Sequence, residues 1–84
     1  MRLDDYLSTV GIVKRRTKAK ELAANGLVEI NGRKAKPAAT VQLADIINIK
    51  GSRPAAFEII EIPSGASVSK ENRDQYYREL PVTR

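Results

Sequence analysis

Five of the eight positions in the segment VKRRTKAK, residues 13–20, are cations. They are Lys14, Arg15, Arg16, Lys18 and Lys20. Guanidinium and ammonium groups at this density suit phosphate binding, because each combines a positive charge with several hydrogen-bond donors. The apolar pattern that follows predicts a helix over roughly 15–25, so the cations would surround its first turn.

A helix N-terminus is an unfavourable place for cations, because its free N–H groups and the helix dipole are already positive. The pairs Arg16/Lys20 and Lys14/Lys18 also repel each other at i, i+4 spacing. Together these effects cost on the order of 1 kcal/mol, and within the helix only Glu21 opposes them. A bound anion would resolve the conflict. We therefore favour phosphate binding over a solvated basic face that only aids solubility.

Apolar spacing predicts two helices before residue 26. In the first, the i, i+3, i+4, i+7 pattern is formed by Leu3, Tyr6, Leu7 and Val10. Asp4 and Asp5 favour its first turn, and Gly11 is expected to end it. The second helix presents small side chains, which allow close packing against the first, and ends at Asn25–Gly26.

The middle of the chain predicts a small sheet. Residues 27–35, LVEINGRKA, read as a strand, a turn at Asn31–Gly32 and a returning strand, because Asn-Gly favours the positive φ angles of a tight hairpin. Further strands are expected at 46–50 and 57–62. The second of these has a slip in its alternation at Ile59–Ile60, which indicates a bulge or burial on both faces.

A short C-terminal helix is expected beyond the sheet. Ser67 or Ser69 could cap it, and Pro81 would stop it after Leu80. The fold class is therefore α+β: two N-terminal helices packed on a small, mostly antiparallel sheet, followed by a short C-terminal helix.

The residue types argue against catalysis and metal binding. The 84 residues include no cysteine and no histidine, which removes the commonest general base and the commonest zinc ligands. Asp4, Asp5 and Asp45 have no nucleophile or glycine-rich phosphate loop beside them. We expect no cofactor and no small-molecule substrate. Because no stretch is long enough to cross a bilayer and the N-terminal segment is acidic, we also expect a cytoplasmic protein without membrane contacts.

The positive charge is concentrated in one part of the chain. The formal net charge is +5; residues 1–50 contain ten Lys/Arg against five Asp/Glu, and residues 51–84 contain five of each. Such a patch is typical of nucleic-acid binding. The only aromatic residues are three tyrosines and one phenylalanine, and Tyr6 and Phe57 fall on apolar patterns. Few rings are left for stacking on single strands, which favours structured RNA recognised by shape and phosphates.

About residues 2–49 resemble the S4 RNA-binding domain family. The resemblance rests on fragments in the family's order: Arg2-Leu3-Asp4, Leu7, Gly11, Arg16-Thr17, Ala19, Leu22, Gly26, Val28, Asn31-Gly32, Val41 and Asp45. Two positions depart from the family pattern. Arg15 stands where Ser is common, which should strengthen phosphate binding. Ala44 stands where Gly commonly precedes the Asp, which should alter the turn slightly.

The resemblance implies an L-shaped RNA-binding surface made by the two helices and the following hairpin. The implied RNA contacts are first Arg2, Lys14, Arg15, Arg16, Thr17, Lys18 and Lys20, and then Asn31, Arg33 and Lys34. If the hairpin packs beside the second helix, its polar residues, with Lys36, would line the same surface. An S4-like domain with its last strand is expected over 1–62, followed by a loop and helical tail over 63–84.

The tail VSKENRDQYYREL and the short chain resemble the small stand-alone S4 proteins, the fifteen-kilodalton heat-shock type and its relatives in ribosome-associated quality control. Those proteins bind the large ribosomal subunit when a nascent chain is stranded on peptidyl-tRNA. The implied partners are structured RNA, namely ribosomal RNA and also transfer RNA, and the large subunit. Another structured RNA, an acidic protein and DNA stay open as alternatives, although a DNA-reading helix usually carries base-reading side chains along its exposed face.

Overall fold

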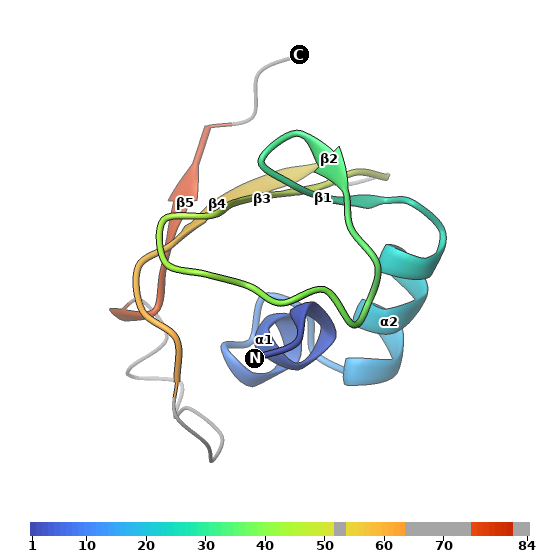
Figure 1. Ribbon diagram of the computed structural model, residues 1–84, viewed down its shortest axis with the longest axis horizontal. Coiled ribbons are helices and arrows are strands. Elements are labelled where there is room, and N and C mark those ends of the chain that lie inside the picture. The colour runs from blue at the N-terminus through green and yellow to red at the C-terminus, as the bar shows by residue number, and fades with distance from the viewer. Residues whose placement is uncertain (52–53, 64–74, 82–84) are drawn as a thin grey trace.

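The computed structural model describes residues 1–51, 54–63 and 75–81. Two helices, α1 (Leu3–Thr9) and α2 (Arg16–Ala24), precede five strands: β1 (Val28–Ile30), β2 (Arg33–Lys34), β3 (Ile46–Ile49), β4 (Ala55–Ile59) and β5 (Tyr77–Leu80). The strands form one antiparallel sheet in the order β2-β1-β3-β4-β5. Both helices lie on one side of this sheet (Figure 1), which confirms the expected α+β class. In the ranges described, no helix has both the length and the apolar character needed to cross a membrane.

The core lies between the helices and one face of the sheet. The apolar stripe expected on α1 is completely buried. The register pairs Val28 with Ile49 and Ile47 with Phe57, and directly paired residues share a sheet face. On α2 the buried positions are Ala19 and Ala23, whose small side chains let α2 approach closely.

The hairpin turn forms as the sequence predicts. Asn31 and Gly32 have φ angles of 53° and 83°, the positive values that a two-residue hairpin of this type requires. Ala44 also has a positive φ, 69°, so this turn keeps a left-handed conformation although its residue is alanine.

The prediction of a C-terminal helix is wrong for the last residues of that segment. Tyr77–Leu80 is strand β5, which pairs antiparallel with β4. The Tyr77 ring packs edge-on against Phe57, with centroids 5.3 Å apart, and Arg78 forms an ion pair with Glu58 on the other face. These cross-strand contacts outweigh helix propensity. The two proposed capping serines lie outside the described residues.

A bulge ends β4 where the alternation slips. The N–H groups of Ile60 and Glu61 both donate to the Tyr76 carbonyl oxygen, at 2.9 and 3.1 Å, a pattern typical of a β-bulge. Ile59 is buried and Ile60 is 49% exposed, so burial on both faces is wrong. The Tyr6 hydroxyl donates to the same oxygen at 2.7 Å and thereby links α1 to the C-terminal strand.

Candidate nucleic-acid interface

A buried carboxylate organises the start of α1. The side chain of Asp4 is 1% exposed, and its Oδ1 accepts the N–H of Asp5 at 2.8 Å. Arg2 donates from Nε to Oδ1 and from Nη2 to Oδ2, each at 3.1 Å. This two-point pairing compensates for removing the charge of Asp4 from water.

Arg16, at the start of α2, joins the same carboxylates. Its Nη1 lies 2.9 Å from Asp5 Oδ1 and its Nε 3.8 Å from Asp4 Oδ2. The side chains of Arg2 and Arg16 nevertheless remain 46% and 53% exposed. We call Arg2, Asp4, Asp5 and Arg16 the arginine cluster. The acidic pair on α1, which the sequence suggested only as a helix start, thus relieves the repulsion at the start of α2.

The two helix N-termini differ in whether their N–H groups are occupied. At α1, Leu3 and Asp4 donate to the carbonyl oxygens of Ala39 and Pro37, at 2.8 and 3.1 Å. At α2, the N-cap residue Arg15 makes no side-chain cap hydrogen bond. Within the described ranges, no acceptor is present for the N–H groups of residues 16–18. The start of α2 is therefore open to an external acceptor such as a phosphate oxygen.

The other cations of the expected first set surround this open helix end. These cations are exposed, and none has an ion-pair partner among the residues that the structure describes; they are Lys14, Arg15, Lys18 and Lys20. Thr17, the second residue of α2, is also exposed and adds a hydroxyl group. Unpaired cations and free N–H groups at one place form a surface suited to a polyanion.

The hairpin residues do not extend this surface as one continuous face. The register places Arg33 opposite Ile30 and Lys34 opposite Glu29, so Arg33 and Lys34 project from opposite faces of the sheet. The Lys34 ammonium lies near the end of α2, where a Cβ added to Gly26 would be 3.7 Å from Nζ. That position is roughly 13 Å from the helix start, given nine residues at 1.5 Å each.

Asn31 has a structural role in the hairpin. Its Nδ2 donates to Asp45 Oδ1 at 3.1 Å, and its Oδ1 accepts the N–H of Ile46 at 2.9 Å. Both ends of the amide therefore hold the turn against the start of β3. An RNA contact from Asn31 remains a prediction, and it would have to use the second amide hydrogen.

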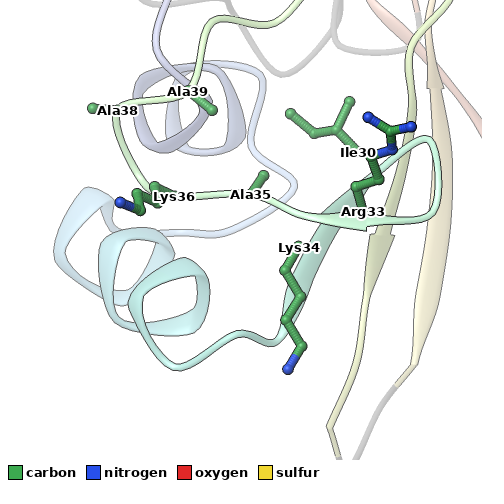
Figure 2. A pocket seen from close by; sticks show the side chains of 7 residues that line it. All are labelled: Ile30, Arg33, Lys34, Ala35, Lys36, Ala38 and Ala39. Atoms are coloured by element: carbon green, nitrogen blue, oxygen red, sulfur yellow. The ribbon is translucent and has the colours of Figure 1, made fainter.

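An open cavity of about 470 Å³ lies between the hairpin and the connection that follows it (Figure 2). Three cations and four apolar residues line it. One of them, Lys36, was grouped with the hairpin cations by the sequence but not with the expected RNA contacts. In the parts of the chain described, no group of three or more acidic side chains could hold a metal ion.

Comparison with known proteins places this architecture in a family. The family model described as the S4 domain matches residues 1–47 of the 84-residue sequence. The chain therefore belongs to the S4 domain family. Its other similarities extend beyond this segment and point to one kind of small S4 protein.

Two relatives and one solved structure cover nearly the whole chain. The chain is 35% identical to the RQC P-site tRNA stabilizing factor of Streptococcus pneumoniae, over 100% of this chain and 94% of that protein. It is also 35% identical to the protein of that name in Helicobacter pylori, over 90% of this chain and 92% of that protein. A trimeric structure of Vibrio cholerae Heat Shock Protein 15 superimposes with a TM-score of 0.85 at 30% identity, over 95% of this chain and 81% of that chain. The resemblance inferred from the sequence is thus confirmed.

Proposed function

We propose that this protein binds ribosomal and transfer RNA on the large ribosomal subunit, and that it acts there in ribosome-associated quality control. Membership of the S4 family supports RNA as the ligand, and the name shared by its relatives supports a tRNA-bound ribosome. The observation that carries the proposal is the open N-terminus of α2, with its unpaired cations, beside the arginine cluster. Such an activity belongs in the cytoplasm.

Binding in this proposal proceeds without catalysis. One phosphate is held by the N–H groups of residues 16–18 together with the side chains of Arg15 and Lys18. A neighbouring phosphate meets the exposed edges of Arg2 and Arg16. Because Asp4 holds Arg2 and Asp5 holds Arg16, the spacing of the two guanidinium groups is set before RNA arrives, and only RNA with phosphates at matching positions satisfies both sites.

Gradient sedimentation in cell lysate tests the proposal. The tagged protein is compared with Arg16→Ala and with Arg78→Ala, which removes the same charge from the outer face of β5. We expect the wild type and Arg78→Ala to sediment with large ribosomal subunits and Arg16→Ala to remain at the top. If the wild type stays at the top, the ribosomal assignment is wrong.

An acidic protein partner is the second candidate, because the same unpaired cations would attract carboxylates. Nuclease treatment before sedimentation separates the two. A complex that survives complete RNA digestion would favour the protein partner, whereas release of the protein would favour RNA.

A further inference from the structure

The cavity beside the hairpin has an apolar floor. Figure 2 shows the side chains of Ile30, Ala35 and Ala39 directed toward one space, and all three pack against the hydrophobic core from its edge. Ala38 lines the same space and is exposed. A surface that recognises only phosphates has no need of such a floor, because phosphate contacts are made by donors and charge.

The rim of the cavity is purely cationic. Arg33 shares the sheet face of Ile30 by register, and Lys36 follows in the connection. Both are exposed, and neither has an ion pair or side-chain hydrogen bond in the described ranges. Lys34 also borders the cavity. The ammonium groups of Lys34 and Lys36 extend away from its apolar floor, that of Lys34 toward Gly26 (Figure 2). No acidic residue lines this space.

The connection that follows the hairpin forms one side of the cavity and is hydrogen-bonded to the start of α1. The carbonyl oxygens of Pro37 and Ala39 accept the first N–H groups of α1, so this side of the cavity adjoins the backbone at the start of α1. The volume of about 470 Å³ falls in the range of roughly 300–1,000 Å³ typical of small-ligand sites.

We infer that this cavity takes a single unpaired nucleotide of the bound RNA, with its base on the aliphatic floor and its phosphate beside Arg33. The inference rests on the proposed RNA-binding function and adds a second mode to it. The aliphatic floor beside an unpaired arginine, with no acidic residue among those that line the cavity, favours a nucleotide over an acidic peptide. Unpaired nucleotides at bulges are accessible for such contacts within otherwise structured RNA.

Three RNA probes separate base binding from phosphate binding. They are a short duplex with one bulged adenosine, the same duplex with an abasic residue at the bulge, and a fully paired duplex. The abasic probe keeps the phosphate and the backbone but lacks the base. We expect the adenosine probe to bind about fivefold more tightly than the abasic one, as roughly 40 Å² of buried apolar surface would give.

Two leucine substitutions test the location. Ala35→Leu enlarges a side chain that points into the cavity (Figure 2) without changing charge, and Ala24→Leu adds the same side chain at an exposed position at the end of α2. Ala35→Leu should lose the preference for the adenosine probe, while Ala24→Leu keeps it. Backbone amide shifts of Ile30 and Ala35 on adding each probe to the wild type give a second measurement that needs no variant.

Each remaining outcome contradicts a defined part of the inference. If the wild type binds all three probes equally, the nucleotide site is wrong while RNA binding stands. If the preference survives in Ala35→Leu, or if the amides of Ile30 and Ala35 in the wild type respond equally to the abasic probe, the site lies elsewhere. If no probe binds even at low salt but an acidic peptide shifts these amides, both this inference and the proposed function are overturned.

Discussion

Asp4 is a negative charge at the centre of a surface that we propose binds a polyanion. Simple charge counting predicts that removing it strengthens RNA binding. The geometry predicts the opposite, because Asp4 holds Arg2 by two hydrogen bonds and lies 3.8 Å from Arg16. Without it, Arg2 loses both hydrogen bonds and Arg16 is held by Asp5 alone.

Asp4→Asn tests this argument. We expect RNA affinity to fall several-fold although the net charge rises to about +6, and stability to fall by roughly 1–3 kcal/mol through lost charge-assisted hydrogen bonds. Filter binding and urea denaturation measure the two effects. Glu21→Gln removes an equal charge from exposed α2 and should bind RNA at least as well as the wild type. Tighter binding by Asp4→Asn would contradict a positioning role.

Ala44 offers a second test at the scale of one residue. Its φ of 69° costs an L-residue about 1–2 kcal/mol. Glycine removes this strain, but its greater conformational entropy in the unfolded chain cancels part of the gain in stability. Ala44→Gly should raise the free energy of unfolding by about 0.5 kcal/mol and leave RNA affinity unchanged. Gly32→Ala is the mirror control: φ is 83° and the site has open space, so we expect destabilisation from backbone strain alone.

Sequence reasoning at this scale identified residue types better than it identified their partners. The cations and the Asn31–Gly32 turn carry local signals, whereas the departure at Ala44 was visible only through the resemblance to the S4 family. The pairing of Asp4 with Arg16 joins two helices, and nothing in the local pattern around either residue reports it. The division of Arg33 and Lys34 between two sheet faces follows from strand register, which could have been anticipated from the alternation around the predicted turn.

At the scale of elements, the first turn of α2 lacks the stabilisation that a capping side chain would provide. Arg15 occupies the N-cap without capping, and a serine there would accept a hydrogen bond from the next turn, worth about 1 kcal/mol. Arg15→Ser should therefore stabilise the protein but weaken RNA binding, since it removes a cation and occupies a free N–H group. Thermal melting and filter binding measure both.

Arg15→Ala separates the two causes. It removes the cation and supplies no cap, so its RNA affinity should lie between those of the wild type and Arg15→Ser. Equal affinities of Arg15→Ala and Arg15→Ser would show that the free N–H groups take no part in binding.

The elements that the sequence predicted well are those with local periodicity. α1 and α2 begin and end within a residue or two of the expected positions because stripes and stop signals are local. β5 was predicted as the end of a helix because possible capping serines precede this segment and Pro81 follows it. Its strand conformation depends on β4, about 20 residues earlier in the chain, as the pair Glu58 and Arg78 shows.

At the scale of the whole molecule, the number of phosphates engaged sets the salt dependence of binding. About six contacts from the arginine cluster, the start of α2 and the cavity rim predict a slope of log affinity against log salt of roughly −4. Arg16→Ala should make the slope shallower by about 0.7. Titrations with structured RNA at several salt concentrations give the value. A slope near zero is incompatible with phosphate-dominated binding.

Tyr6 connects the two ends of the described chain, and Tyr6→Phe should lower the free energy of unfolding by about 1 kcal/mol. Burial, and to a lesser extent Tyr77, raises the pKa of the Tyr6 hydroxyl. The folded state therefore holds this proton more tightly than the unfolded state, and the contribution is present below pH ~10 and lost as pH rises above it. Urea denaturation at neutral and alkaline pH should show the difference between the two proteins shrinking at high pH. A difference that grows with pH would contradict this.

The oxygen shared by Tyr6, Ile60 and Glu61 also has a consequence for the order of folding. Tyr6 and Tyr76 are separated by 70 positions, and closing so long a loop costs entropy before any contact repays it. The helices and the β1–β2 hairpin can form from neighbouring residues, so the junction of α1 with the C-terminal strand would come late. Interactions that form after the folding transition state affect the unfolding rate rather than the folding rate. The hydrogen bonds to this carbonyl oxygen would thus mainly slow unfolding. Weakening them would shorten the lifetime of the folded chain while leaving its refolding rate almost unchanged.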